Sequence, residues 1–392
     1  MVWQAAEKAL TRLFQLPAMT NSARPRRQRE TASRVLRNAR RLSAPCQSER
    51  RRRRRLWSGA RDLGNSPTKH ATLVDRTALV VETAVTEPQT SPSLAAIPPP
   101  PRPRPLKKIV STCADVVRNT HDTVTLSFDV GEQPQYTAGQ FISIDPKQFT
   151  ELSRQIAFLE HLKGKKEKHR AYSMSSAPAE RYVSITVKAE GFDAAHDNYP
   201  PLLSPFLASE GMKGRSVQFI GYTGAYVLPE GHDVITRQVL HLVAGSGIVP
   251  NYALLKDELL QAKHPSVKHT MVYVNKTADD VILLAELEEL RARFPERLQL
   301  IHRITRAPES DDLSARGAHW LRGRPTSEWL KTIVPDPSTV WVYACGAAIT
   351  EHQRAAAKVT GVPATPRFME GVEEMLHALG VTKDRFKKEE FG

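Results

Sequence analysis

An antiparallel β-barrel domain followed by a doubly wound α/β domain, behind a disordered N-terminal tail, is the architecture that this 392-residue sequence predicts. Three observations lead to it. The first hundred residues are basic and end in a proline-rich run. From residue 107, short segments of alternating apolar and polar residues indicate strands joined by turns. From about residue 238, apolar runs alternate with helical stretches, which is typical of a parallel sheet with helical crossovers.

Residues 1–106 form the predicted disordered tail. Residues 1–108 hold 23 Lys+Arg against 7 Asp+Glu, whereas the rest of the chain holds 33 against 35, so the net charge of +14 belongs to the tail. The run 98–105 is a polyproline linker that cannot join a packed core. Residues 1–16 have a helical apolar stripe and precede an arginine- and serine-rich stretch, which resembles a mitochondrial presequence. We expect a cytoplasmic protein, with the mitochondrion as the alternative location.

Composition excludes several classes of function. Because the folded part is close to neutral, nothing in it favours a nucleic-acid partner. The three cysteines, Cys46, Cys113 and Cys345, lie far apart without a CxxC pair, so we expect no metal site and no disulfide framework. An iron–sulfur cluster normally needs four thiolates, and this chain has too few. No apolar run approaches the roughly 18 residues of a transmembrane helix, so we expect no transmembrane segment.

The first folded domain is predicted over residues 107–233. Strands are expected at 124–130, 140–144, 181–188 and 215–220. A lysine-rich segment, 147–169, precedes the motif Arg170-Ala171-Tyr172-Ser173. This motif suits a flavin, because a guanidinium can hold a pyrophosphate, a tyrosine can stack on a planar ring, and a hydroxyl can reach a ring nitrogen. Taken alone, the motif also fits ordinary sheet surface.

Further along this domain, Ser204 followed by Pro205 predicts a helix that is capped by the serine and has proline at its first position. Such a helix start presents free N–H groups that can bind a phosphate. A helix cap without a ligand is the alternative interpretation.

The second folded domain is predicted over residues 234–392. Apolar runs at 239–244, 269–274, 298–303 and 340–344 alternate with helical stretches at 252–262 and 284–294. The motif Gly245-Ser246-Gly247-Ile248-Val-Pro follows the first of these strands and opens a helix, which is the context of a phosphate-binding turn. The last core strand ends in Tyr343-Ala-Cys345-Gly346. A buried cysteine at that position is more often a small hydrophobic residue than a catalytic group.

Taken in order, these motifs resemble the ferredoxin–NADP reductase superfamily over residues 107–392, with Gly221-Tyr-Thr-Gly224-Ala-Tyr226 as a further match. The chain is most similar to the reductase components of oxygenase systems, without a fused iron–sulfur domain. The resemblance implies an FAD-binding β-barrel domain and an NAD(P)-binding α/β domain, with NADP as the expected dinucleotide and NAD as the alternative. An extra helix near 349–359 departs from the family pattern.

The resemblance also implies roles for individual residues. Arg170 would hold the FAD pyrophosphate, Tyr172 would stack on the flavin ring, and Ser173 would bond near flavin N5. Cys345 and Glu390 would complete the catalytic residues, with Cys345 against the nicotinamide. The remaining cofactor-binding residues that we expect are Ala171, Val187, Lys188, Ser204, Gly245, Ser246, Gly247, Ile248, Gly346 and Phe391. A cationic cluster of Lys276, Arg306 and Arg324 would favour the 2′-phosphate of NADP. The alternative interpretation is that these three residues are ordinary surface charges without a ligand.

We therefore expect an NAD(P)H-dependent flavoprotein reductase that passes electrons through FAD to a separate one-electron acceptor, an acidic ferredoxin or oxygenase component. The lysines Lys163, Lys165, Lys166 and Lys168 would steer such an acidic carrier toward the flavin, and a solvated loop without a partner is the alternative. A cytochrome b5 reductase-like or flavin/quinone reductase is the alternative function within the enzymes. From another class, a non-catalytic flavin-binding regulator is the rival hypothesis.

Overall fold

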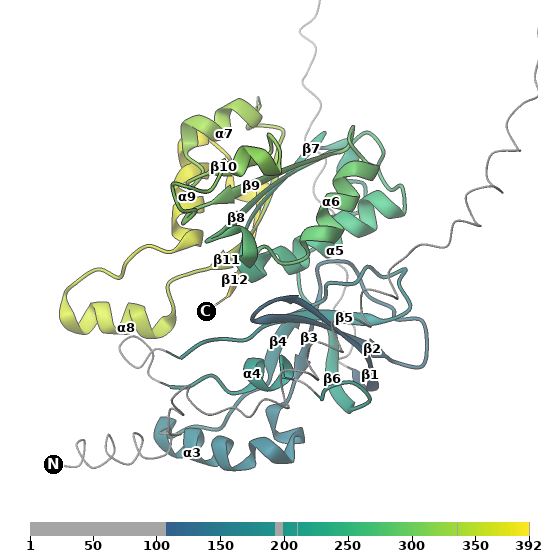
Figure 1. Ribbon diagram of the computed structural model, residues 1–392, viewed down its shortest axis with the longest axis vertical. Coiled ribbons are helices and arrows are strands. Elements are labelled where there is room, and N and C mark those ends of the chain that lie inside the picture. The colour runs from purple at the N-terminus through teal and green to yellow at the C-terminus, as the bar shows by residue number, and fades with distance from the viewer. Residues whose placement is uncertain (1–106, 193–198, 210, 335, 392) are drawn as a thin grey trace, which may run out of the picture. The chain divides into compact units, whose positions relative to one another are not determined.

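The computed structural model describes residues 107–192, 199–209, 211–334 and 336–391, so the predictions for residues 1–106 lie outside the described chain. The described residues form two six-stranded sheets, which Figure 1 shows as separate groups of arrows. All strand pairs of the first sheet are antiparallel, and all pairs of the second are parallel. The predicted order of an antiparallel domain followed by an α/β domain is confirmed.

The antiparallel sheet has the strand order β4-β3-β6-β1-β2-β5. Its strands are β1 (Lys107–Thr120), β2 (Thr123–Asp129), β3 (Phe141–Ile144), β4 (Arg170–Ser173), β5 (Val183–Lys188) and β6 (Ser216–Thr223). An isolated bridge between Met174 and Ile185 joins the two edge strands β4 and β5. At this point the sheet closes on itself as a barrel.

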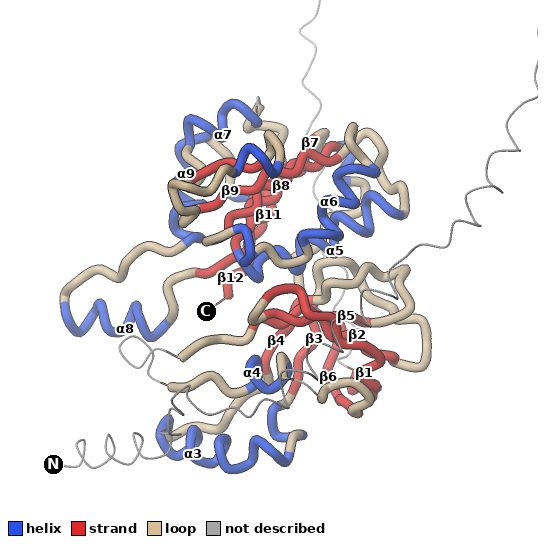
Figure 2. The backbone as a smooth tube through the Cα atoms, in the orientation of Figure 1, coloured by secondary structure: helices blue, strands red, loops and turns tan. Residues whose placement is uncertain are grey.

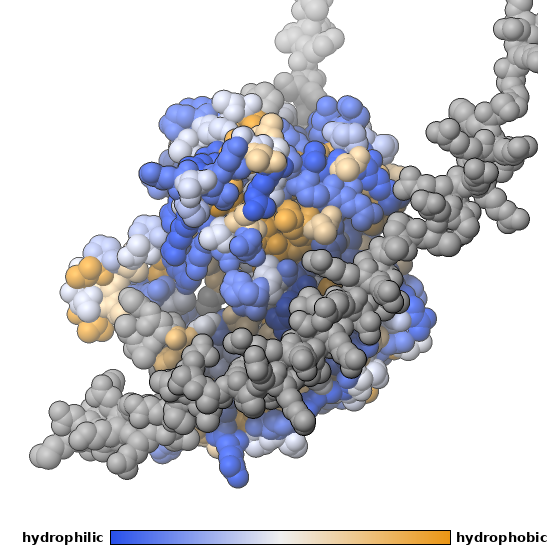
Figure 3. Space-filling view, viewed as in Figure 1, coloured by the Kyte–Doolittle hydropathy of each residue, from blue (hydrophilic) through white to orange (hydrophobic). Residues whose placement is uncertain are grey.

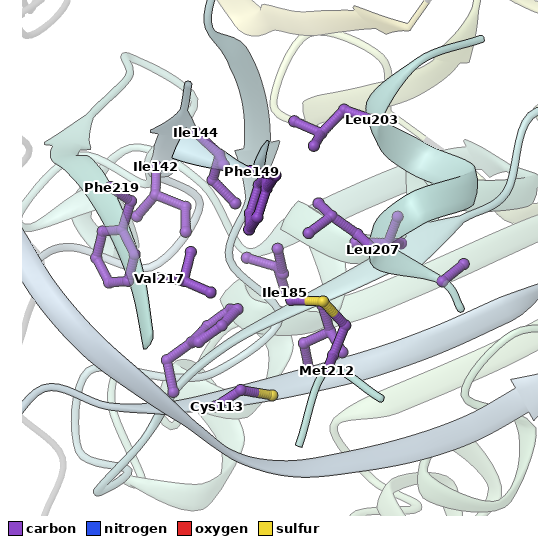
Figure 4. Packing of buried hydrophobic residues seen from close by; sticks show 14 of the residues in the cluster. Cys113, Ile142, Ile144, Phe149, Ile185, Leu203, Leu207, Met212, Val217 and Phe219 are labelled. Carbon is purple, nitrogen blue, oxygen red and sulfur yellow. The ribbon is translucent and has the colours of Figure 1, made fainter. Parts of the chain in front are cut away.

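The barrel core follows from the alternation of side chains along each strand. Figure 4 shows Ile142 and Ile144 of β3 with Val217 and Phe219 of β6 around one interior, and all four side chains are buried. Leu207 of the short helix α4 (Leu203–Leu207) packs into the same cluster. The apolar positions of the predicted strands therefore supply part of this core.

The lysine-rich insertion is a packed element rather than a surface loop. It contains helix α3 (Ser153–Lys163), which ends at Gly164 in a left-handed conformation. Phe149, Ile156 and Leu159 of this segment are buried in the barrel core. The insertion therefore has a fixed position against the barrel.

The predicted helix cap at Ser204 is wrong. Helix α4 begins at Leu203, two residues before the predicted first position at Pro205, and Leu202 occupies the cap position without a side-chain capping bond. The Ser204 hydroxyl instead donates a 3.1 Å hydrogen bond to a carboxylate oxygen of Glu190. This tertiary partner, far from Ser204 in sequence, takes the hydroxyl that local capping chemistry would use.

The parallel sheet has the strand order β10-β9-β8-β7-β11-β12. Its strands are β7 (Gln238–Ala244), β8 (Lys268–Asn275), β9 (Leu298–Ile304), β10 (Trp320–Arg322), β11 (Trp341–Ala347) and β12 (Phe386–Phe391). The order reverses direction between β7 and β11, whose residues Val243 and Cys345 are paired. Ligands of doubly wound sheets bind outside the carboxyl ends of the strands at such a switch point.

Helices cover both faces of the parallel sheet. They are α5 (Ile248–Leu260), α6 (Leu284–Arg293), α7 (Ser327–Ile333) and α9 (Phe368–Leu379). A further helix, α8 (Glu351–Thr360), has no buried residue. Figure 2 shows α5 and α6 on one side of the strands and α7 and α9 on the other, and two separate hydrophobic clusters fill these two faces. Helix α5 begins at Ile248, four residues before the predicted start, so it follows the glycine-rich turn directly.

Helix α8 is the extra helix that the sequence predicted near 349–359. None of its residues is buried, and Figure 3 shows hydrophobic and hydrophilic residues mixed over this part of the surface. Among the described residues, no helix combines the length and apolar character needed to cross a membrane.

Candidate functional site

A cleft of about 1530 Å³ lies where the carboxyl ends of β7 and β8 face strands β4 and β5 of the barrel. Its volume exceeds the roughly 300–1,000 Å³ of a pocket for one drug-sized ligand. The predicted site residues that line this cleft are Arg170, Ala171, Tyr172, Ser173, Val187, Lys188, Ser204, Gly245, Ser246, Lys276, Arg324, Glu390 and Phe391. Those that do not line it are Gly247, Ile248, Arg306, Cys345 and Gly346.

Two cations on the barrel side of the cleft share one buried carboxylate. The Glu167 side chain is only 2% exposed and accepts hydrogen bonds from Lys163 Nζ at 2.5 Å and from Arg170 Nη2 at 2.6 Å. Burial alone would raise the pKa of Glu167, but these two hydrogen bonds hold it below its usual range. Two positive charges and one negative charge leave this cluster of three side chains net positive, which suits an anionic ligand. The sequence motif predicted Arg170 but not the contributions of Lys163 and Glu167.

Ser173 meets the C-terminal strand at the centre of the cleft. Its hydroxyl donates a 2.6 Å hydrogen bond to Glu389 Oε1. Burial raises the pKa of Glu389, and the hydrogen bond from Ser173 opposes that rise. The predicted catalytic carboxylate, Glu390, also lines the cleft but accepts a 2.7 Å bond from Lys388. Because side chains alternate along β12, Glu389 rather than Glu390 reaches Ser173.

The aromatic and polar residues around β4 and β5 form the rest of the barrel wall. Tyr172 is half-buried, and burial raises the pKa of its phenol, so the ring is neutral at physiological pH. Lys188 Nζ lies 2.7 Å from Asp122. The neutral ring and this paired cation can contact the planar and anionic parts of a nucleotide, respectively.

The two glycines of the glycine-rich turn are needed for different structural reasons. Gly245 has a φ of +53°, and no atom lies within 4 Å of the position that a Cβ would take. A Cβ at Gly247 would lie 2.1 Å from the backbone oxygen of Cys345. Gly245 thus leaves the backbone open to the cleft, whereas Gly247 allows the turn to pack against β11. The Tyr273 hydroxyl donates a 3.0 Å bond to the Gly245 carbonyl and orients this turn.

Cys345 lies behind the cleft wall rather than on it. The side chain is fully buried in a cluster with Tyr226 and Tyr343. Burial, followed by the neighbouring Glu389 charge, raises the pKa of its thiol well above the usual value, so the sulfur remains protonated. Gly346 follows it, and a Cβ there would lie 2.5 Å from the Phe368 ring.

A second group of cations lies at the carboxyl ends of β8, β9 and β10. Lys276 and Arg324 line the cleft, while Arg306 is held near them by a 2.8 Å bond from its backbone N–H to the Lys276 carbonyl. None of these three side chains has an ion-pair partner within the part of the chain that the structure describes.

Beside these cations, the Asn275 side chain lines the cleft and is buried, and both of its amide atoms lack a hydrogen-bond partner. Leaving a buried polar group unpaired costs about 1–3 kcal/mol, so a water or a polar ligand is expected at this amide. The sequence marked Asn275 as the end of a strand but assigned it no role.

Comparison with known proteins agrees with this geometry. The family model "Oxidoreductase NAD-binding domain" matches residues 242–354. NADH-cytochrome b5 reductase 2-B of Vanderwaltozyma polyspora is 30% identical over 171 residues, which are 43% of this chain and 53% of that protein. The ferredoxin reductase component of 3-ketosteroid-9-alpha-monooxygenase from Mycolicibacterium smegmatis is 28% identical over 197 residues, 48% of each chain. The chain thus spans about half the length of these relatives.

Among solved structures, the FAD/NAD-binding domain of nitric oxide dioxygenase from Vibrio cholerae superposes with a TM-score of 0.52 at 22% identity. The match covers 72% of this chain and 98% of that domain. At this level of identity, the likeness shows a shared fold.

Proposed function

We propose that this chain, which belongs to the ferredoxin–NADP reductase-like superfamily of FAD- and NAD(P)-binding reductases, carries electrons from NAD(P)H through FAD to a separate acceptor. One observation carries the proposal. A single cleft is lined both by Arg170, Tyr172 and Ser173 of β4 and by Gly245 and Ser246 after β7. A flavin on the first wall and a nicotinamide on the second would therefore face one another.

The residues on the barrel wall fit FAD. The net positive cluster of Lys163, Glu167 and Arg170 would bind the pyrophosphate, since charge-assisted hydrogen bonds from a guanidinium favour phosphate oxygens. The neutral Tyr172 ring would stack on the isoalloxazine, and Lys188 would lie beside the adenosine part. The chemistry that FAD supplies when bound is to accept a hydride from a nicotinamide and to pass electrons on singly.

The opposite wall fits a nicotinamide dinucleotide, and we propose NADPH as the preferred one. The open turn at Gly245 lets the backbone approach a pyrophosphate. The unpaired Lys276 and Arg324, with Arg306 beside them, would bind a 2′-phosphate. The unpartnered Asn275 amide supports a polar ligand at the same place.

The Ser173 hydroxyl and the Glu389 carboxyl are the protein groups at the junction of the two walls. A hydroxyl held by a carboxyl group has a fixed direction, so Ser173 would position the flavin ring rather than carry charge. Cys345, buried and protonated, would support the nicotinamide site from behind through its backbone.

For the acceptor, we propose an acidic ferredoxin or oxygenase component, and the names of the relatives make cytochrome b5 the alternative. Two of the four lysines expected to steer a carrier are engaged elsewhere. Lys163 pairs with Glu167, and Lys166 lies 2.8 Å from Glu160. Lys165 and Lys168 are exposed, and neither has an ion-pair partner among the residues described.

Flavin binding by the Arg170→Ala variant tests the proposal. The purified chain should be yellow with bound FAD and should reduce a dye with NADPH or NADH. Arg170→Ala should weaken FAD about 10-fold or more and FMN much less, because only FAD has the pyrophosphate assigned to this guanidinium. The matched control is Arg181→Ala, since Arg181 pairs with Asp129 outside the cleft. A folded, colourless protein that gains no flavin when FAD is added would refute the proposed function.

A further inference from the structure

A group of metal-ligating side chains lies away from the cleft, on the side of the parallel sheet where β7 and β8 begin. His232 lies in the turn before β7, Glu258 in the last part of α5, and His264 in the connection from α5 to β8. None of the three lines the cleft. His232 and Glu258 are buried, and the His264 side chain is 25% exposed.

The distances among the three side chains match those around a small metal ion. His264 Nδ1 lies 3.1 Å from Glu258 Oε2, and His232 Nε2 lies 3.7 Å from the same oxygen. Zinc ligands at their usual bond lengths in a tetrahedron are about 3.3 Å apart. The ligand atoms of all three residues lie within 4.8 Å of one another. A divalent ion can therefore enter with small side-chain adjustments.

His232 already presents a free lone pair to this position. Its Nδ1 lies 3.0 Å from the Pro229 carbonyl, which can only accept, so Nδ1 carries the proton. Its Nε2 is then unprotonated, and it is buried with no hydrogen-bond partner. A histidine that ligates a metal typically has its other nitrogen bonded to a carbonyl in this way.

Within the described residues, no Lys or Arg side chain bonds the Glu258 carboxylate, whose two oxygens are each 3.1 Å from His264 Nδ1. The nearby Arg297 guanidinium donates to the backbone carbonyls of Glu258, Lys263 and His264 rather than to the carboxylate oxygens. His264 can keep its proton on Nε2, which faces Asp233 at 3.7 Å, when Nδ1 turns to a metal. Asp233 would then hold the imidazole from outside the ligand set.

We propose that His232, Glu258 and His264 bind one Zn²⁺ ion or a similar first-row divalent ion, with a water as the fourth ligand. Two imidazoles and one carboxylate are ligands that this class of ion prefers. The ion would join the turn before β7 to the end of α5 and to the connection that leads to β8. This site is independent of the proposed reductase function.

A second cluster also consists of one glutamate and two histidines, but its carboxylate is bonded differently. Glu288, His302 and His319 also bring their ligand atoms together. There, however, Arg291 donates a 2.7 Å bond to Glu288 Oε2, and both imidazoles already bond the other carboxylate oxygen. The carboxylate is therefore neutralised by the Arg291 cation, which disfavours a metal ion there.

Zinc titration of the full chain tests the site. The protein, purified with its flavin and without a histidine tag, is treated with a chelator and titrated with Zn²⁺ by calorimetry. The variants are His264→Ala, whose side chain is the most exposed of the three, and Glu258→Gln. His319→Ala from the second cluster is the matched control. Flavin content and dye reduction, which depend on the distant cleft, report whether each variant is folded.

We expect wild type and His319→Ala to bind one Zn²⁺ more per chain than His264→Ala. Glu258→Gln should weaken that site at least about 10-fold, and saturating Zn²⁺ should raise the Tm of wild type but not of His264→Ala. Equal zinc binding by wild type and His264→Ala, or no zinc binding by wild type, would overturn the proposal. If wild type binds no zinc, then a water or a proton, rather than a metal ion, occupies the lone pair of His232 Nε2.

Discussion

The hydroxyl of Ser173 donates a 2.6 Å hydrogen bond to the carboxylate of Glu389, a residue 216 positions later in the chain. Ser173 ends β4 in the barrel, and Glu389 lies in β12 at the edge of the parallel sheet. The bond therefore crosses between the two sheets at the centre of the cleft that both of them line.

Replacing Ser173 should slow the first half of the reaction. We expect Ser173→Ala to lower the rate of flavin reduction by NAD(P)H roughly 10- to 100-fold, since a hydrogen bond that involves a charged group is worth about 1.5–3 kcal/mol. Stopped-flow absorbance of the bound flavin measures this rate. Ser127→Ala is the control, because Ser127 bonds Ser184 and does not line the cleft. Equal rates in both variants would remove Ser173 from the site.

The buried Glu389 carboxyl should make stability depend on pH. Burial raises its pKa above the ordinary value of 4.5, so the folded state holds this proton more tightly than the unfolded state. The resulting stabilisation is present below pH 4.5 and is lost as the pH rises through the pKa of the folded state. Relative to Glu389→Gln, wild type should therefore lose free energy of unfolding between pH 4.5 and neutrality. Urea unfolding at several pH values measures the difference, and a constant difference would contradict the assignment.

The two glycines of the turn after β7, Gly245 and Gly247, should respond differently to alanine. Gly247→Ala brings a methyl group against the Cys345 carbonyl, and we expect a loss of about 3 kcal/mol in the free energy of unfolding. Gly245→Ala meets no atom, so the cost of its positive φ, about 1 kcal/mol, should dominate. Because the Gly245 methyl would stand in the cleft, this variant should raise the KM for the dinucleotide. The prediction fails if Gly245→Ala is the less stable of the two.

Lys276 should contribute to the choice of dinucleotide. We expect Lys276→Ala to lower the NADPH/NADH ratio of kcat/KM about 10-fold, since a charged hydrogen bond to a 2′-phosphate would be lost. Steady-state dye reduction with each dinucleotide gives the ratio. Lys331→Ala, which removes an exposed lysine on α7 away from the cleft, is the control. If both variants keep the wild-type ratio, Lys276 has no role in specificity.

Lys165 and Lys168 should accelerate electron transfer to an acidic carrier. Exposed charges act at long range, so the Lys165→Glu/Lys168→Glu variant should transfer electrons about 10-fold more slowly at low salt and lose most of its salt dependence. Reduction of a neutral dye should not change, because it needs no steering. Transfer to the carrier at the wild-type rate in low salt would exclude this surface as the docking site.

Much of this protein can be predicted from its sequence, because the relevant signals are local. Alternating residues predicted four strands of the barrel, β2, β3, β5 and β6, and the alternation of apolar runs with helical stretches predicted β7, β8, β9 and β11 of the parallel sheet. The motifs Arg170–Ser173 and 245–248 mark two walls, and the structure places Arg170, Ser173, Gly245 and Ser246 in one cleft. In each case a few consecutive residues carry the signal.

Only the tertiary structure decided which side chains meet. The acidic end of the chain predicted Glu390 for the site, but the register of β12 turns Glu389 toward Ser173, and a shift of one residue exchanges the two faces of a strand. Ser204 has the sequence of a helix cap, yet its hydroxyl bonds Glu190. Lys163 belongs to a lysine-rich segment, yet its side chain is mostly buried and pairs with Glu167.

The same holds for the candidate metal site, whose ligands His232, Glu258 and His264 have no recognisable spacing in the sequence. They come together because α5 packs beside β7 and brings its end to the turn where that strand begins. Local sequence determines the kind of each element, since backbone preference and side-chain periodicity act over a few residues. Packing and strand register determine which functional groups touch, since they depend on residues far apart in the chain.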